Sequence, residues 1–224
     1  MITNKNIQFD YLGNYGNSNW IRTNRTIDYT LAVNWMEETV KKIQLEKHNN
    51  TVWLLEHQSV ITGGSLSKSE ELFNNDNVPV VKSGRGGQWT WHGPGQRVAY
   101  IMMDLNERNR DVKKYVRDIE ILIIKTLNDF SIKAFNRKNF PGVWVYSKKG
   151  DQFDKIASIG IRVSKWIAYH GVSININPNL DYFNNIISCG VKDGGVTSTY
   201  KMGFNISMID FDKKFANNFL KIFK

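Results

Sequence analysis

The sequence predicts an α/β fold in which helices flank a mixed β-sheet. Apolar residues recur at three- and four-residue steps in three segments, which is typical of amphipathic helices. Short apolar runs bounded by polar or glycine-containing segments lie between them and favour strands. The last strand-like runs follow one another without an intervening helix, which favours a mixed sheet over a strictly alternating parallel one. The 224 residues are expected to form one domain, 1–224.

The first half of the chain is expected to contain one helix and three strands. After a beginning without a clear pattern, Thr26 can cap a helix. Its apolar face comprises Leu31, Trp35, Met36, Val40 and Ile43. The apolar runs that predict strands are 51–56, 78–83 and 97–105.

The second half has the clearest helical pattern, at 111–130, where Asp111 occupies the position of a capping residue. Three strands are then expected in succession, at 142–147, 155–164 and 166–177. A final helix is predicted within 207–223, where the apolar positions at helical spacing are Phe211, Phe215, Phe219 and Leu220.

Composition narrows the class of protein. Lys and Arg number 30 against 21 Asp and Glu, a formal charge of +9 that favours anionic partners. No run of five basic residues and no helix-turn-helix, zinc-finger or RNP signature supports a nucleic-acid-binding role. Acidic protein partners explain the charge as well, and so does mutational bias toward Lys and Asn.

Cysteine usage and hydropathy predict a cytoplasmic protein with no membrane segment. The single Cys excludes an internal disulfide, and the four His show no metal-ligand spacing, so no metal site is expected. The N-terminal residues resemble neither a signal nor a transit peptide, and no apolar stretch of about 18 residues is present.

A glycine-dense segment, 84–96, is the first candidate site. Its 13 residues hold five Gly, one Pro, one Arg, one His and two Trp. A long surface loop would explain the Gly and Pro, but it would rarely also carry two Trp and a His. Glycine permits close backbone approach to a ligand, and Trp89 and Trp91 can form walls around an apolar tail. The segment fits neither the Walker pattern nor GxGxxG, so an elongated, partly apolar substrate is favoured.

Lys155 heads the second candidate segment. Strand alternation places it on one face with Ala157, Ile159 and Ile161. It can simply mark an exposed strand start. A buried lysine amine, however, favours its neutral form and can act as a base near neutral pH. Small residues at Ala157, Ser158 and Gly160 would leave room for a substrate along the strand.

Cys189 is the third candidate. A lone cysteine is commonly a small buried apolar residue. Here its neighbours are polar and rich in glycine, including Gly190 and Gly194–Gly195, which fits a nucleophile about as well. A cysteine nucleophile reacts as the thiolate and needs a nearby base. The candidates by residue type are His57, His92, His170 and Lys155.

Together these segments resemble the lipoyl(octanoyl) transferases of lipoate biosynthesis. The resemblance runs from about residue 54 to 198 and is carried, in order, by RGGQWTWHGPGQ, PGVWV, KIASIGIRV, YHGVSININ, and SCGV followed by GVTS. It implies a fold like that of the biotin and lipoate ligases. It also implies that Cys189 accepts the acyl group and that Lys155 is its catalytic partner. The implied substrate-binding residues are Arg85, Gly86, Gly87, Gln88, Trp89, Thr90, Trp91, His92, Ser158, Ile159, Gly160, Gly171, Val172 and Ser173.

A few positions depart from the family pattern. Arg97 and Ile101 stand where the family more often has an aliphatic residue and a proline, and Ser188 replaces a common proline. Gln58–Ser59 vary the turn that is usually EHPP-like. None of these changes removes a chemical group that the reaction needs.

The resemblance implies transfer of an octanoyl group from acyl carrier protein to a lysine of lipoyl domains, the first committed step of endogenous protein lipoylation. The acceptors would be the E2 subunits of 2-oxoacid dehydrogenases and the glycine cleavage H protein. The acyl group would arrive on the phosphopantetheine of the carrier, so no other cofactor is expected. The alternatives are an ATP-dependent lipoate–protein ligase and a non-catalytic, basic nucleic-acid-binding module.

Overall fold

A computed structural model describes residues 7–73, 78–147, 152–187 and 194–223 of the chain. Short 3-10 turns connect several of its helices and strands. The helices and strands are, in order, β1 (Asp10–Tyr15), β2 (Ser18–Ile27), α1 (Tyr29–Gln44), β3 (Asn50–His57), β4 (Val60–Gly63), β5 (Val80–Lys82), β6 (Trp89–His92), β7 (Gln96–Asp104), α2 (Val112–Asn128), β8 (Ala134–Arg137), β9 (Phe140–Tyr146), β10 (Phe153–Ser164), β11 (Ile167–Asn175), β12 (Gly195–Val196) and α3 (Met208–Ile222).

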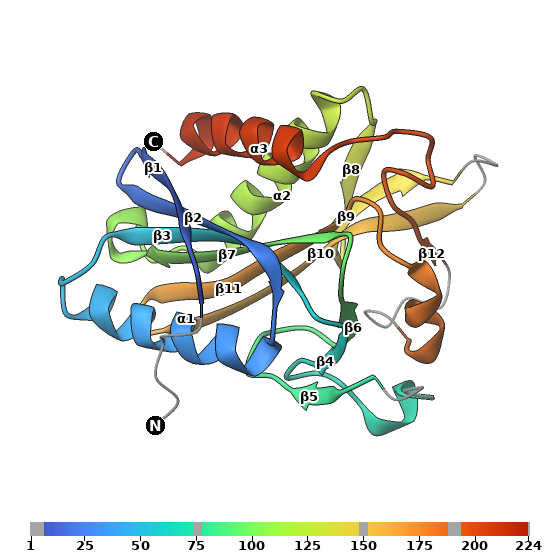
Figure 1. Ribbon diagram of the computed structural model, residues 1–224, viewed down its shortest axis with the longest axis horizontal. Helices are drawn as coiled ribbons and strands as arrows, with labels where there is room; N and C mark the ends of the chain where they lie inside the picture. Colours follow the sequence, from blue (N-terminus) through green and yellow to red (C-terminus); the bar gives the residue numbers. More distant parts are fainter. Residues whose placement is uncertain (1–6, 74–77, 148–151, 188–193, 224) are drawn as a thin grey trace.

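The strands of the described residues form a large mixed sheet and a small one. The large sheet has the order β1-β2-β3-β7-β11-β10-β9-β8, with β12 added beside β10. The β2–β3 and β10–β12 pairs are parallel and the others are antiparallel. The small sheet, β5-β4-β6, lies at one end of the molecule (Figure 1). The predicted mixed sheet flanked by helices is therefore confirmed.

The large sheet carries a different apolar cluster on each face. Helix α1 lies on one side, and α2 and α3 lie on the other (Figure 1). Strand β7 contributes to both clusters, because successive side chains of a strand point to opposite faces. Val98 and Tyr100 pack in the α1 cluster, whereas Ala99 and Ile101 pack in the cluster beneath α2 and α3. Both faces of the central strands are thus buried.

The helix starts show one wrong and one confirmed prediction. Thr26 belongs to β2, and α1 begins after Asp28, whose Oδ1 accepts a hydrogen bond from the Leu31 N–H at 2.9 Å. Asp111 does cap α2, because its Oδ1 accepts from the Lys114 N–H at 2.8 Å. Strands β1 and β2 account for most of the N-terminal region in which no pattern was evident.

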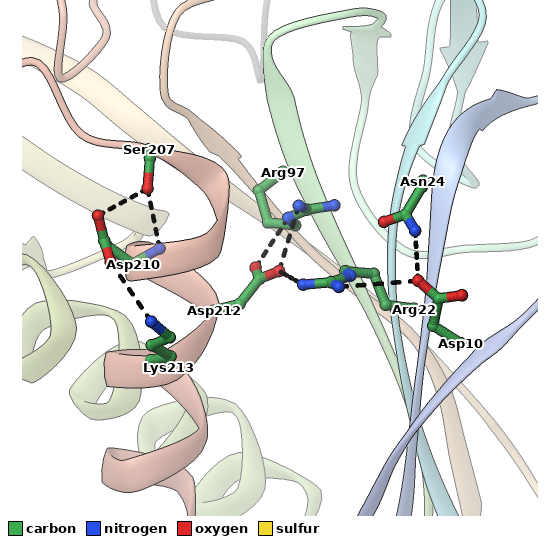
Figure 2. A network of polar contacts seen from close by, with 8 residues as sticks. All are labelled: Asp10, Arg22, Asn24, Arg97, Ser207, Asp210, Asp212 and Lys213. Atoms are coloured by element: carbon green, nitrogen blue, oxygen red, sulfur yellow. Dashed lines mark hydrogen bonds and ion pairs between the residues drawn. The ribbon is translucent and has the colours of Figure 1, made fainter.

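Arg97 belongs to a charge network on the α2–α3 face, in which the Arg97–Asp212 pair is buried and Arg22 and Asp10 are partly exposed (Figure 2). Its Nε lies 2.9 Å from Asp212 Oδ1 of α3, and Arg22 Nη1 lies 3.8 Å from Asp212 Oδ2. Arg22 also reaches Asp10 of β1 at 3.7 Å. The network joins β1, β2 and β7 to α3. It gives Arg97 a partner at a position where the family more often has an aliphatic residue.

Two other departures from the family pattern are also accounted for by contacts. Ile101 is fully buried beneath α2 and α3. The Ser59 hydroxyl accepts a hydrogen bond from Trp91 Nε1 at 2.9 Å, which ties the varied turn to β6. Ser188 lies outside the described residues.

Candidate active site

A cavity of about 40 Å³ lies on the α1 face of the sheet and is called the first cavity here. Strands β10 and β11 form its floor, and Tyr29 of α1 contributes from the opposite side. Its lining comprises Tyr29, Arg85, Gly87, Gln88, Thr90, His92, Val98, Tyr100, Ser158, Ile159, Gly160, His170, Gly171, Val172 and Ser173. The structure thus brings together residues from all three segments that the family resemblance implies for substrate binding.

Most of the predicted substrate-binding residues line this cavity, but three do not. Gly86 lies just outside, where its N–H donates to Ile161 O of β10 at 3.0 Å and attaches the glycine-dense segment to that strand. Trp89 and Trp91 were expected to be walls for an apolar tail, and this expectation is wrong for the first cavity. Residues 89–92 form β6, so the two tryptophans point away from the face that carries Thr90 and His92.

The tryptophans instead form an apolar cluster behind the cavity. Trp91 stacks on Tyr182 at 4.9 Å between ring centroids, and Trp89 Nε1 donates to Lys68 O at 2.6 Å. Both side chains are buried in a cluster with Ile61, Val78, Phe183 and Ile186. Their contribution is to hold β6 rigidly, so that its other face can form the cavity wall.

Two glycines allow the strands and the glycine-dense segment to approach closely. A Cβ on Gly160 would lie 2.9 Å from Arg85 Cδ and 3.2 Å from Gly86 O. A Cβ on Gly171 would lie 2.0 Å from Ala99 O of the neighbouring strand. Any larger residue at these positions would push the cavity walls apart.

Arg85 is the main charged group in the first cavity, and its guanidinium is held in place. Nη2 donates to Thr62 O at 2.7 Å and to Thr62 Oγ1 at 2.8 Å, while Nη1 donates to Gly86 O at 2.9 Å. These bonds fix a buried cation at the wall of the cavity, where it can face an anion or a carbonyl oxygen.

The histidines of this region have defined hydrogen-bonding roles. His57 Nδ1 lies 2.9 Å from Ile27 O, and a carbonyl can only accept, so Nδ1 carries the proton. His57 Nε2 therefore accepts from the Tyr100 hydroxyl at 2.7 Å. His92 Nδ1 donates to Gln96 Oε1 at 2.7 Å, because the Gln96 amide nitrogen is directed to Trp91 O and Asn175 Oδ1.

Burial keeps these histidines uncharged. Desolvation lowers the pKa of His57 to about 4 and, together with Arg85 and Arg162, that of His170 to about 3. The pKa of His92 is lowered well below its ordinary value, first by burial and then by His57 and Arg85. Apart from Arg85, the cavity therefore presents neutral side chains at pH 7.

Lys155 lies in a second cavity of about 580 Å³. Only 3% of its surface is exposed, so the alternative of an exposed strand start is wrong. Its Nζ donates to Pro141 O at 3.0 Å and lies 4.7 Å from the centroid of the Trp144 ring. The remaining lining includes Leu180, Phe183, Ile186, Ile187, Gly194, Gly195 and Val196.

The described residues that flank the cysteine segment also line the second cavity. Cys189 and Gly190 lie outside the described residues. Ile187 and Gly194, the described residues on either side of 188–193, both line the Lys155 cavity. Strand β12 pairs with β10 so that Val196 lies beside Lys155.

Strand β10 connects the two cavities. Lys155 faces the second cavity, and Ser158 of the same strand lines the first. The pairing of β10 with β9 shifts register between Lys155 and Ala157, and Ile156 and Ala157 both pack beneath α2 and α3. The alternation is interrupted there, so Lys155 lies on the same face as Ser158 and not, as expected, on that of Ala157. Three residues of a strand span only about 10 Å. A group that reacts beside Lys155 is thus within a short distance of the first cavity.

The described ranges show neither a cluster of metal-ligating side chains nor a membrane-spanning helix. Within them, no three His, Cys, Asp or Glu residues are grouped so that they could hold a metal ion. None of the helices in the described part of the chain is long and apolar enough to cross a membrane.

The chain is similar to known proteins in its fold and in its sequence. A solved bi-partite lipoate protein ligase from Thermoplasma acidophilum, studied with its E2 lipoyl domain, matches 85% of this chain and 79% of its own, with a TM-score of 0.64. At 12% identity it demonstrates the fold alone. The expected resemblance to the lipoate ligase fold is confirmed.

Sequence relatives are much closer. The octanoyltransferase of Bartonella quintana is 43% identical over 211 residues, covering 91% of this chain and 86% of the relative. That of Rickettsia peacockii is 45% identical over 199 residues, covering 88% and 95%. The family model of the lipoyl protein ligase A/B catalytic domain matches residues 28–220. This chain is therefore a member of the lipoyl protein ligase A/B family and belongs to its octanoyltransferases, which are acyltransferases.

Proposed function

We propose that the chain, acting as one catalytic domain, takes its octanoyl group from an acyl carrier protein and passes it to a lipoyl-domain lysine through a thioester on Cys189. The observation that carries the proposal is the position of Lys155. Its amine is buried in the cavity that Ile187 and Gly194 also line, on either side of the segment holding Cys189. That cavity lies next to one with mostly neutral walls.

The first half-reaction forms the acyl-enzyme. Lys155 accepts the proton of Cys189, and the thiolate attacks the carbonyl carbon of the carrier thioester. The bond between that carbon and the phosphopantetheine sulfur breaks, and the departing thiolate takes back the proton. Because one thioester replaces another, little free energy is lost. Pro141 O fixes the position of the Lys155 amine for this exchange.

The second half-reaction transfers the acyl group to the acceptor. A neutral lysine amine of the lipoyl domain attacks the octanoyl-Cys189 carbonyl and forms an amide. The sulfur leaves as thiolate, and Lys155 relays the proton released by the amine to it. The covalent intermediate allows two bulky proteins to use the same site one after the other.

The first cavity suits the hydrocarbon part of the substrate. Each buried methylene contributes about 0.8 kcal/mol, so a chain of this length gains several kcal/mol on burial. Neutral His92 and His170 in the cavity lining do not require water around them, as charged imidazoles would. Small residues at Gly160 and Gly171 keep the floor open.

The charge of the chain supports acidic protein partners. The formal charge of +9 would speed encounter with an acidic carrier or lipoyl domain. The Thermoplasma ligase, which shares the fold, was studied with an E2 lipoyl domain, and we infer an acceptor of that kind here. We expect kcat/KM to fall as ionic strength rises.

The decisive experiment is intact mass spectrometry after mixing the protein with octanoyl-acyl carrier protein and no ATP. One added octanoyl group is expected, released by hydroxylamine and absent from Cys189→Ala. Lys155→Ala should acylate much more slowly at neutral pH and recover partly at alkaline pH. Lys138→Ala, an exposed lysine between β8 and β9, is the matched control and should acylate normally. A requirement for ATP and free octanoate would instead identify a ligase.

A further inference from the structure

A third cavity, of about 230 Å³, adjoins the first at the end farthest from Lys155. It lies between α1 and β5, with Val33 of α1 and Val81 of β5 among its lining. The first and third cavities share two lining residues, Tyr29 and His170. These two side chains therefore form the partition between the spaces.

The strand register shows that His170 stands at the distal end. In the β10–β11 pair, Ser158 lies opposite Ser173, Gly160 opposite Gly171 and Ile161 opposite His170. Moving away from Lys155 along these strands, His170 is thus the last residue of the first cavity. An acyl chain attached beside Lys155 would have its terminal methyl directed toward His170.

The two partition residues differ in how they are held. The Tyr29 hydroxyl is hydrogen-bonded to Ser83 Oγ at 2.7 Å, and the Tyr29 ring stacks over His92. His170 is only 2% exposed, yet within the described residues neither of its ring nitrogens has a hydrogen-bond partner. The His170 ring contacts the rings of Tyr169 and Tyr100, at 5.2 and 6.0 Å between centroids, but it can turn without breaking a hydrogen bond. The Tyr29 side chain cannot.

The first cavity alone is small for its proposed ligand. Its volume of about 40 Å³ is far below the roughly 300 Å³ or more of typical ligand pockets. The walls formed by β10, β11 and Arg85 are fixed by strand pairing and hydrogen bonds. The side that can yield is the partition, and behind it lies the larger third cavity.

We propose that His170 sets the length of acyl chain that the protein accepts, as the movable wall between the first and third cavities. This inference rests on the proposed function and deepens it. An octanoyl chain reaches the partition and displaces the His170 ring slightly. A chain with four more carbons would have to enter the third cavity, which the ring and Tyr29 obstruct. His170 takes part in no chemical step, and it affects only which donor chain length fits the site.

The test compares octanoyl, decanoyl and dodecanoyl donors with the wild-type protein and His170→Gly. His170 adopts the left-handed conformation, with φ of 60°, so glycine removes the ring and also relieves backbone strain. The ratio of kcat/KM for dodecanoyl over octanoyl transfer should rise about tenfold or more, since each methylene that a pocket admits or rejects is worth at least that. An unchanged ratio would overturn the proposal.

A second variant tests where the longer chain goes. In the His170→Gly background, Val33→Phe should fill the third cavity and return the ratio to the wild-type value. The control is His48→Gly, which replaces a histidine that lines neither cavity. It should leave the dodecanoyl-to-octanoyl ratio unchanged. A gain that survives Val33→Phe would mean that the chain does not enter the third cavity, contrary to the proposal.

Titration calorimetry with free C8, C10 and C12 fatty acids separates this inference from the catalytic proposal. His170→Gly should bind the C12 acid about tenfold more tightly, relative to the C8 acid, than the wild type does. This holds whether or not an acyl-enzyme forms. If the wild type transfers octanoyl but His170→Gly shifts neither the kcat/KM ratio nor the binding ratio, only the role of His170 is refuted. A shift in binding without any acyl-enzyme would refute only the Cys189 route.

Discussion

Strand β7 has buried polar side chains of opposite character on its two faces. On the α1 face, the Tyr100 hydroxyl donates to a neutral His57, and no formal charge is involved. On the α2–α3 face, Arg97 pairs with Asp212 in a network of ions (Figure 2). Tyr100 and Arg97 are three residues apart and lie on opposite sides of the same backbone.

One face of β7 has neutral and the other has charged buried side chains because only the α1 face borders the first cavity. A buried ion is tolerable only where partners satisfy it permanently, because its desolvation amounts to several kcal/mol. The Arg97–Asp212 pair is buried, and Asp212 belongs to α3, which covers the α2–α3 face. The α1 face borders the cavity that we propose for the apolar chain, and neutral rings can border such a chain without a large penalty. Its one buried cation, Arg85, is held by hydrogen bonds to Thr62 and Gly86.

Removing one partner of the Arg97–Asp212 ion pair should have the largest effect on stability. Arg97→Met leaves Asp212 buried with only Arg22, at 3.8 Å, and should lower the free energy of unfolding by about 3–5 kcal/mol. Urea denaturation at pH 7 measures this loss. Octanoyl transfer well below the melting temperature should be unchanged, because the network faces away from the first cavity.

The double variant Arg97→Met/Asp212→Leu supplies the control. With both charges gone, no unpaired ion remains, and most of the lost stability should return. If the double variant is as unstable as the single one, Arg97 acts through the packing of its side chain rather than through its charge.

As the pH falls, the buried groups on the two faces should change the free energy of unfolding in opposite directions. The pKa values of His57 and His170, about 4 and about 3, lie below the ordinary 6.5. The unfolded chain therefore binds protons that the folded chain does not, and stability is lost as pH falls below 6.5. By pH 5 each histidine should remove about 2 kcal/mol from the free energy of unfolding.

Asp212 should act in the opposite direction. Burial raises its pKa to about 6, although Arg97 and Arg22 lower it. Between pH 7 and 5 the folded chain binds this proton more readily than the unfolded one, which offsets about 1 kcal/mol of the acid loss. Unfolding curves from pH 7 to 5 should therefore fall more steeply for Asp212→Asn than for the wild type, and less steeply for His57→Gln.

Two buried tyrosines allow the hydrogen bonds of the faces to be compared directly. Tyr100→Phe leaves His57 Nε2 buried without its donor and should destabilise the protein by about 1–2 kcal/mol. In Tyr115 of α2, the buried hydroxyl has no hydrogen-bond partner within the described residues. Tyr115→Phe should thus be neutral or stabilising. Equal losses in thermal unfolding of the two variants would contradict this assignment.

Much of this division between faces was predictable from the sequence. The apolar spacing that predicts α2 and α3, and the capping position of Asp111, depend on local periodicity, and both were confirmed. The glycine-dense segment and the strand around Gly160 were expected to bind substrate, and residues from both line one cavity. The placement of Cys189 beside Lys155 stays a prediction.

The parts that were not predicted depend on contacts between distant segments. Trp89 and Trp91 do not line the first cavity, because β6 pairs with β4 and its side-chain alternation turns them to the other side. The Arg97–Asp212 pair links residues 115 positions apart, and nothing in the local pattern indicates it. Thr26 does not cap α1, because β2 continues to Ile27 through its pairing with β3.

The smallest losses of stability are expected from removing the caps of α1 and α3. Together these two variants test whether KM depends on the α1 face and not on the α2–α3 face. Asp28→Ala removes the acceptor of the Leu31 N–H, and Ser207→Ala removes that of the Asp210 N–H; each should lose about 1 kcal/mol. Their effects on catalysis should differ. Asp28 precedes Tyr29, part of the partition between the first and third cavities, so its loss should raise KM for octanoyl donor by a measurable factor. Ser207 lies on the charged face, and its loss should leave KM unchanged. Matched KM values in the two variants would show that the start of α1 does not position the cavity wall.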